Sequence, residues 1–501
     1  MTTASTTSYT LPRATSRTSA DVPEHVQRWW RWLHRPVITP PADGVGGRVL
    51  LISYQFPPTG GSGVQRPAKL AKYLPRCGWQ VEVLTAAHDR FPWTDTSLLA
   101  DLPDDLITHR IAGHEPACVA RWLGAQCARL GGERYGRRVD DALHWRLTGW
   151  ADRLGLQNGE SLWIGPATRA AIRRHRETPF DAVISTGPPH FVHRVAMQVA
   201  RLTGLPWLAD LRDPLVSDFD RTGCSPRQAR RMREYEADIV ERADLIVTTC
   251  PSFAWDLQQR YPERTRRIRA ITNGFDRDDI RRAVRPAELA GDTRDECTLV
   301  AAGAFYGRRE LSRIIRPLQR LMQLHPPYAG RVKLVIAGTI DAEQRRALQQ
   351  NTPEFVSLAG YVDHAEAIAL TARAACSIVV VPACEHGHLS IPGKTFELLA
   401  VPTHVLALVP SGSDTEHIVR RTGGCTVAPF EREHAVFSAL RGIIESHFSG
   451  ELQADRDWTR VDAFDRQIIA RRFADCLEAA CCEKTGRRGI ASHNREAVEV
   501  A

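Results

Sequence analysis

Residues 48–85 read RVLLISYQFPPTGGSGVQRPAKLAKYLPRCGWQVEVLT, the pattern of a strand, a helix and a second strand. The apolar run at 48–53 is short and bounded by polar residues, which is typical of a buried parallel strand. A helical pattern covers 64–76, Gly78 ends it, and a second apolar run follows at 81–85. Two strands joined by a helix need a crossover connection, so the stretch favours a parallel α/β sheet.

The same alternation continues along the chain in two series. Further strands of the first series are expected at 182–186, 207–210, 244–249 and 268–272, with helices at 190–203 and 226–242 and Ser252 as a helix N-cap. The second series has expected strands at 298–303, 332–337, 356–359, 377–381, 405–408 and 426–428, and a last helix at 463–482. Two such series predict an α/β fold of two doubly wound Rossmann-like domains facing a cleft.

The resulting domain map has seven parts. They are a disordered tail (1–22), a Trp/Arg-rich segment (23–46), the first domain (47–280) with a helical insertion at about 115–160, a linker (281–296), the second domain (297–460), a helix crossing back (461–483) and a disordered tail (484–501). The Trp-rich helix at 24–36 suits either an anionic lipid surface or docking on the protein. The insertion, with Trp among Arg, suits contact with a membrane surface or a polyanion, and an ordinary helical insertion with a solvated face is the alternative.

Composition narrows the class of protein. Of 501 residues, 43% are hydrophobic and 25% charged, which is ordinary for a soluble globular chain. The net charge of +8 attracts anions such as nucleotides or phospholipid headgroups, but no nucleic-acid recognition motif accompanies it. The cysteines form no metal-ligand spacing, and no signal peptide or run of about 18 apolar residues is present. We therefore expect a cytoplasmic protein without metal, either free or at the inner face of the membrane.

The loop FPPTGGSG (56–63) follows the first expected strand and opens a helix. Open α/β sheets bind ligands at this position. Gly61 and Gly63 would let backbone N–H groups approach an anion. The loop matches neither GxGxxG nor a Walker sequence, so a plain tight turn stays an alternative.

Two more loops place polar groups at strand ends. Asp210, Arg212 and Asp213 follow one strand, and His190 begins a helix after another. Arg212 is suited to a carboxylate or phosphate, and a structural Arg–Asp pair that holds the loop is the alternative.

The motif IPGKTFELL (391–399) gives the strongest signal. Pro-Gly sets a turn and a helix begins near Lys394. Gly393 and Lys394 suit a diphosphate, and Glu397, one turn later on the same face, suits a ribose diol. Arg308 and Arg309, after the strand at 298–303, would aim at the same diphosphate, which would allow transfer without metal.

These stretches together resemble the bacterial retaining family 4 (group 1) glycosyltransferases of the IPGK-type subgroup. The resemblance rests on 53–85, 184–193 with 205–214, 271–280, and 360–370 with 391–400. It implies a GT-B fold, in which the first domain takes the acceptor and the second a nucleotide sugar, with retention of anomeric configuration. It suggests a role in polysaccharide, glycolipid or secondary-metabolite biosynthesis. The acceptor would be a hydroxyl group, and a lipid-linked saccharide is one of the candidate acceptors.

The resemblance also implies roles for individual residues. Catalytic roles fall to Arg309, Lys394 and Asp210, donor binding to Gly61, Gly63, Arg308, Gly393 and Glu397, and the acceptor side to Arg212, Asp213 and His190. No cofactor is expected beyond the nucleotide sugar as co-substrate. Two departures, Leu389 and Ala304, stand where many members carry Glu and Arg. They keep open a non-catalytic GT-B subunit, and a nucleotide-sugar epimerase or hydrolase is a further alternative.

Overall fold

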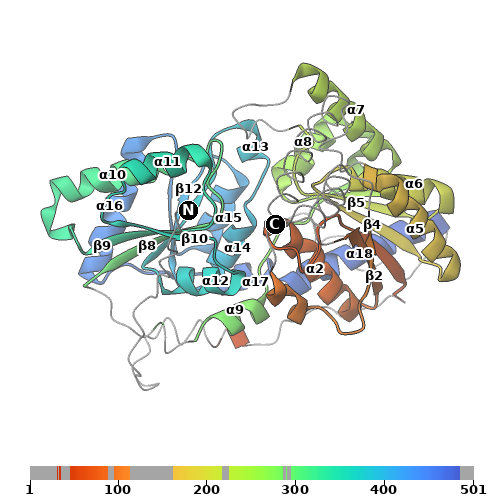
Figure 1. The fold of residues 1–501 in the computed structure, drawn as a ribbon, viewed down its shortest axis with the longest axis horizontal. Helices are drawn as coiled ribbons and strands as arrows, with labels where there is room; N and C mark the ends of the chain where they lie inside the picture. The colour runs from red at the N-terminus through yellow and green to blue at the C-terminus, as the bar shows by residue number, and fades with distance from the viewer. Residues whose placement is uncertain are drawn as a thin grey trace, which may run out of the picture.

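The computed structural model describes residues 31, 33–34, 46–87, 95–112, 162–216, 225–285, 289 and 295–485. These residues form two all-parallel sheets, each flanked by helices, in two lobes that lie side by side (Figure 1). The predicted α/β fold of two Rossmann-like domains is therefore confirmed.

The first sheet has the strand order β3-β2-β1-β4-β5-β6-β7. Its strands are β1 (Arg48–Ile52), β2 (Gln80–Ala86), β3 (Ile107–Ile111), β4 (Ala182–Gly187), β5 (Trp207–Leu211), β6 (Leu245–Thr248) and β7 (Ile268–Ala270). Its helices are α2 (Gln65–Tyr73), α5 (Ile164–Glu177), α6 (Val192–Thr203), α7 (Pro226–Arg242), α8 (Pro251–Arg260) and α9 (Arg277–Ala283). Because side chains alternate along a strand, Val49 and Leu51 join one apolar cluster, and Leu50 and Ile52 join the cluster on the other face.

The second sheet repeats this plan with the strand order β10-β9-β8-β11-β12-β13. Its strands are β8 (Cys297–Ala302), β9 (Val332–Ala337), β10 (Val356–Gly360), β11 (Cys376–Val380), β12 (His404–Leu408) and β13 (Cys425–Ala428). Its helices are α10 (Ser312–Leu324), α11 (Ala342–Gln350), α12 (His364–Arg373), α13 (Glu385–His388), α14 (Gly393–Leu399), α15 (Asp414–Thr422) and α16 (Glu433–Ser449). Both sheets thus place their crossover helices on two faces, as a doubly wound fold requires.

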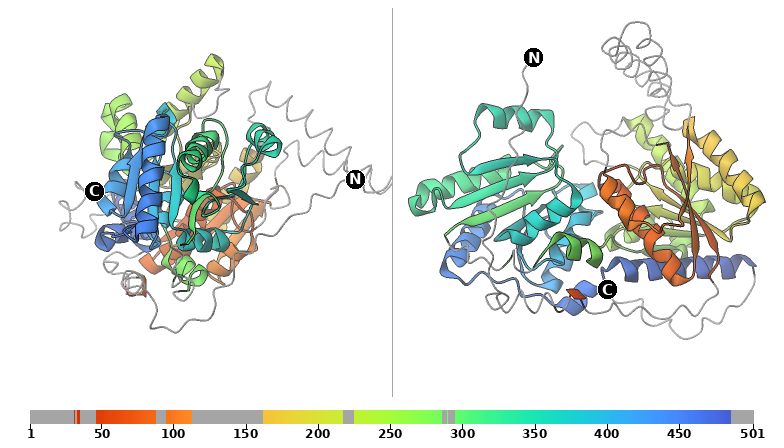
Figure 2. Two further views of the ribbon diagram at one scale, coloured as in Figure 1. Left: turned by 90° about the vertical axis from the view of Figure 1, so that its left-hand side faces the viewer. Right: turned by 60° about the horizontal axis from the view of Figure 1, so that its bottom comes forward.

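The last two helices, α17 (Trp458–Asp462) and α18 (Arg466–Thr485), return to the first domain. Helix α18 runs along the first sheet beside α2 (Figures 1 and 2). Phe473 and Leu477 of α18 are fully buried in the apolar cluster that also holds Val49 and Leu51. The first domain therefore takes part of its core from the end of the described chain.

Most of the expected elements form close to their expected bounds, with two differences of note. The strand β9 and the helix α7 have the bounds predicted for them. Ser252 is not an N-cap, because α8 begins one residue earlier, at Pro251, with Cys250 as its N-cap. The edge strand β3 was not predicted, because its ITHRI sequence is half-buried and has no clear apolar period.

The tails and the insertion at 115–160 lie outside the described residues, as do the tryptophans of the Trp-rich helix. Leu33 of that segment is buried, and its carbonyl oxygen accepts a 3.0 Å hydrogen bond from Arg281 Nε on α9. At Leu33 the segment therefore docks on the protein. Among the described residues, none of the helices combines the length and hydropathy that a bilayer crossing requires.

Candidate functional site

The strand orders mark one place in each domain for a ligand. The order reverses between β1 and β4 in the first sheet and between β8 and β11 in the second. Ligands of doubly wound sheets bind beyond the carboxyl ends of the strands at such a reversal. The segments that follow these four strands carry Gly61, Gly63, His190, Arg308, Arg309, Gly393, Lys394 and Glu397.

Lys394 lies at the carboxyl end of β8. Its ammonium donates to the carbonyl oxygen of Ala302 and lies 5.4 Å from the centre of the Phe305 ring. Gly303 has φ +124°, and a Cβ there would lie 2.8 Å from Lys394 Nζ, so a side chain would displace the ammonium. Burial, followed by the charge of Arg309, lowers the pKa of Lys394 to about 7. An anion bound beside this group would favour its charged form.

Arg309 lies in the loop after β8, where the charge of a first-domain carboxylate acts on its pKa. Gln344 Nε2 donates to the carbonyl oxygens of Arg309 (3.2 Å) and Phe305 (3.4 Å), which fixes the loop after β8. Burial lowers the pKa of Arg309, and the hydroxyl of Tyr306 and the carboxylate of Asp213 oppose that change. Asp213 belongs to the loop after β5, so the charge of a predicted acceptor-side residue acts on a predicted diphosphate ligand.

Glu397 has a partner that the sequence did not predict. Its Oε1 lies 2.8 Å from Nε2 of His364, the first residue of α12. Burial would raise the pKa of Glu397, but His364, Arg466 and Lys69 together hold it below its usual value. Glu397 is therefore ionised and held in one orientation. The one sequence feature that could have pointed to His364 as a site residue is its place at the start of a helix, directly after the N-cap Asp363 in the stretch GYVDH.

Arg212 holds two loops of the first domain. Its guanidinium donates to the carbonyl oxygens of Gly63 and Pro188, one from each of the loops that follow β1 and β4. Gly61 needs its glycine for a φ of +99°, and a Cβ at Gly63 would lie 2.6 Å from Gln55 Oε1. Arg212 thus holds the glycine-rich loop in place. This structural role is closer to the alternative of a loop-holding arginine than to the predicted role as a ligand of a phosphate or carboxylate.

Asp210 is fully buried in this structure. Its carboxylate accepts two hydrogen bonds from Arg66, at 2.8 and 2.9 Å, and one from Thr186 Oγ1 at 2.7 Å. Arg66 also donates to the carbonyl oxygens of Ile271 and Thr272. Asp210 has no exposed surface for a substrate, so we assign it a positioning role in place of the predicted catalytic one.

His190, in the segment between β4 and α6, carries a neutral imidazole. Burial lowers its pKa to about 4, although Asp213 opposes the change. Its Nδ1 is buried and has no hydrogen-bond partner among the described residues. Tyr235 donates a 2.8 Å hydrogen bond to the carbonyl oxygen of His190, which fixes the backbone there.

Arg308 points to a different place from Arg309. It is exposed and lines a hollow of about 360 Å³, whose lining residues are Arg308, Glu310, Arg313, Pro382, Ala383 and Glu431. Neither Arg309 nor Lys394 belongs to this lining, so the structure does not bring Arg308 together with the two cations at the end of β8.

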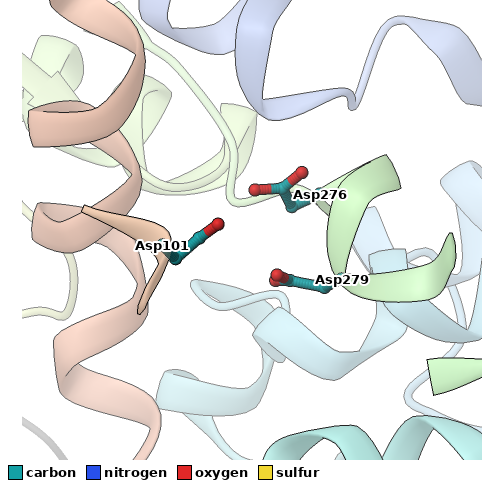
Figure 3. A group of neighbouring side chains, drawn as sticks. All are labelled: Asp101, Asp276 and Asp279. Atoms are coloured by element: carbon teal, nitrogen blue, oxygen red, sulfur yellow. The ribbon is translucent and has the colours of Figure 1, made fainter. Parts of the chain in front are cut away.

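A buried cluster of charged side chains surrounds the two lysines of α2, the helix that follows the glycine-rich loop. Its members are Lys69, Lys72, Asp101, Asp276 and Asp279. The three carboxylates converge within 4.8 Å of one another (Figure 3). Lys69 Nζ lies 2.6 Å from Asp276 and 2.7 Å from Asp279. Lys72 Nζ lies 2.7 Å from Asp101 and 2.9 Å from Asp276. The positive charge that these carboxylates need thus comes from two lysines one turn apart on α2 and from Arg282 on α9, which pairs with Asp101 and Asp279.

A family model matches most of the first domain. Residues 60–274 match the family model described as Glycosyl transferase 4-like domain. No curated protein sequence matches the chain.

Solved structures resemble the chain over both domains. Anabaena HepE, in complex with UDP and glucose, has a TM-score of 0.56 at 13% identity, covering 86% of this chain and 99% of that one. Sucrose-phosphate synthase from Thermosynechococcus elongatus has a TM-score of 0.56 at 17% identity, covering 86% and 98%. The lipopolysaccharide outer core galactosyltransferase WaaB, in its apo form, has a TM-score of 0.52 at 11% identity, covering 86% and 99%. At these identities the likeness is one of fold.

Proposed function

We propose that this chain, which carries a glycosyl transferase 4-like domain and shares the two-domain GT-B fold, transfers a sugar from a nucleoside diphosphate sugar to a hydroxyl acceptor. One observation carries the proposal. Lys394 and Arg309 approach each other at the strand-order reversal of the second sheet, closely enough that Arg309 lowers the pKa of Lys394. Two partly buried cations in one neighbourhood suit an anion that carries two phosphates.

In this proposal the second domain holds the donor. Lys394 and Arg309 bind the diphosphate, and Glu397 accepts hydrogen bonds from the ribose hydroxyls. Gly393 leaves open space at the start of α14, so the phosphates can approach its backbone. Among the described residues, the nearest atom to the position of a Cβ there is Asn273 Nδ2, at 3.9 Å. Each charge-assisted hydrogen bond contributes about 1.5–3 kcal/mol. Two such bonds that strengthen as the diphosphate leaves would stabilise the transition state without metal.

The acceptor then lies on the side of the first domain. His190 and Asp213 line this side, and Arg212 and Asp210 position the loops around it. We propose retention of configuration, with a phosphate oxygen of the donor taking the proton of the attacking hydroxyl. The acceptor class is a polysaccharide, a glycolipid or a secondary metabolite, and a lipid-linked acceptor would place the protein at the inner membrane face.

UDP-glucose is the first donor to test, because the HepE structure contains UDP and glucose. We would measure thermal stabilisation by UDP, GDP, dTDP and ADP and their glucose conjugates, in the wild type and in Lys394→Met and Glu397→Gln. Lys333→Met is the matched control, because Lys333 is 40% exposed and pairs with Glu296. A ligand at about 100 times its Kd stabilises by about 2.7 kcal/mol. We expect one nucleotide to stabilise the wild type and the control but neither site variant.

Product analysis separates the alternatives. Sugar transfer to added cell-envelope acceptors supports the proposal, whereas isomerised or hydrolysed sugar from donor alone indicates an epimerase or hydrolase. No stabilisation by any of these ligands would overturn the donor site and favour a non-catalytic subunit. Leu389, half-buried against the apolar core, and Ala304 are the two residues that keep that alternative open.

A further inference from the structure

Four charged side chains form a continuous chain between the two domains. Lys69 Nζ on α2 lies 2.7 Å from Asp279 Oδ2 on α9. Asp279 Oδ2 lies 3.9 Å from His364 Nδ1 on α12, and His364 Nε2 lies 2.8 Å from Glu397 Oε1 on α14. Positive and negative groups alternate along this chain when the imidazole is protonated.

His364 is the step that crosses between the domains. Its side chain is 18% exposed, and the carboxylates of Glu397 and Asp279 lie on opposite sides of the ring. Burial alone would lower the pKa of His364, but Glu397 and Asp279 together raise it to about 9, and Lys69 opposes them. At neutral pH the ring is therefore a cation that separates two carboxylates, which would repel each other without it.

The two ends of this chain lie in the parts of the site that must meet around a donor. Helix α2 starts directly after the glycine-rich loop, through the short 3-10 turn Ser62–Val64. Helix α14 carries Lys394 and Glu397. The ion-pair chain therefore joins the helix behind the first domain's loop to the helix that holds the second domain's donor ligands.

We propose that His364 is a positioning residue for donor binding, which orients the carboxylate of Glu397 and couples it through Asp279 to the helix of the glycine-rich loop. The proposal rests on the proposed function, because Glu397 is taken there as the ribose ligand. A sugar nucleotide bound to Glu397 would then order the glycine-rich loop through this chain.

The first test is calorimetric binding of the sugar nucleotide that the wild type prefers. His364→Gln keeps a hydrogen-bond donor for Glu397 but removes the charge, and Asp279→Asn removes the next charge in the chain. We expect each variant to weaken binding about tenfold and the double variant to be no weaker than His364→Gln alone, because both changes break one pathway. His434→Gln, at an exposed position of α16, is the matched control and should bind as the wild type does.

The pH profile supplies a readout that a purely structural role would not move. The ratio of Kd in His364→Gln to Kd in the wild type should fall toward one above pH 9, where the wild-type ring also loses its proton. Taking this ratio removes the titration of Lys394, which both proteins share. A ratio that stays constant from pH 7 to pH 10 would overturn the proposal.

Hydrogen exchange tests the coupling itself. In the wild type and His434→Gln, donor binding should protect amides of both 60–73 and 391–400. In His364→Gln at saturating donor, 391–400 should still gain protection and 60–73 should gain less. Equal protection of 60–73 in all three proteins, or unchanged affinity in His364→Gln, would overturn this proposal alone. A wild type that binds no sugar nucleotide would overturn the proposed function, and this proposal with it.

Discussion

Donor binding should weaken as the pH rises through the pKa of Lys394, which burial and the nearby Arg309 lower to about 7. The protonated ammonium is the form that binds a diphosphate. Well below pH 7 the free protein already carries this proton, so the affinity should not change with pH. Above pH 7 the proton must be taken up on binding, and the affinity should fall until the pH reaches the higher pKa of the complex.

The magnitude follows from the protonated fraction of Lys394 in the free protein. With a pKa of about 7, roughly nine tenths of the ammonium is protonated at pH 6 and roughly one tenth at pH 8. The apparent Kd should therefore rise about tenfold between these pH values, which corresponds to about 1.4 kcal/mol. His364, with a pKa of about 9, stays mostly protonated over the same range and adds little to the slope.

The assay is titration calorimetry with a sugar nucleotide, because its two phosphates carry no proton that titrates near neutral pH. Repeating the titration in two buffers of different ionisation enthalpy gives the protons taken up, which should be about one at pH 8 and about a tenth at pH 6. Lys394→Met should bind more weakly, with neither proton uptake nor pH slope. A wild type without a slope, or the same slope in Lys394→Met, would refute the reasoning.

Other predictions concern stability and the shape of the site. Lys69→Met should lower the free energy of unfolding by about 3–5 kcal/mol in urea titrations, because it removes the buried ammonium that pairs with Asp101, Asp276 and Asp279. Lys333→Met at the surface should cost about 1 kcal/mol or less. Gly303→Ala should weaken donor binding about tenfold by displacing the ammonium beside it. Gly412→Ala, also at a positive φ (+76°) but in open space, should lower the melting temperature and leave Kd unchanged. Asp414→Ala should cost about 1 kcal/mol, because its Oδ2 accepts the amide N–H of Ser252 at the start of α8; an unchanged urea midpoint would contradict this.

The repeating part of the fold could be predicted because its signals are local. The strand Val332–Ala337 is a short apolar run, and the buried strand forms with the predicted bounds. Gly393, Lys394 and Glu397 lie within one short helix, so their neighbourhood could be anticipated from spacing alone. Signals of this kind depend on residues a few positions apart.

The pairings that decide individual roles could not be predicted, because they depend on long-range contacts. The sequence predicts a free carboxylate for Asp210 at the end of a strand, but in the structure this carboxylate accepts hydrogen bonds from Arg66, 144 positions away. Lys69 and Asp279 lie 210 positions apart and meet only once the first domain has folded. Apolar periodicity places side chains on a face, but it does not say which buried charge neutralises which.

The return of α18 to the first sheet has a consequence for how the protein is made. Phe473 and Leu477 complete an apolar cluster whose other members come mainly from residues 49–83 and 182–271. During synthesis the ribosome delivers those residues first, then the whole second sheet, and only then the helix that covers them. The first domain can therefore complete its native core only after the second domain has been translated. Until then, the apolar face that α18 covers stays exposed. For the same reason, a chimera that exchanges the second domain needs two junctions, one before and one after that domain. Helix α18 must be kept with the first domain.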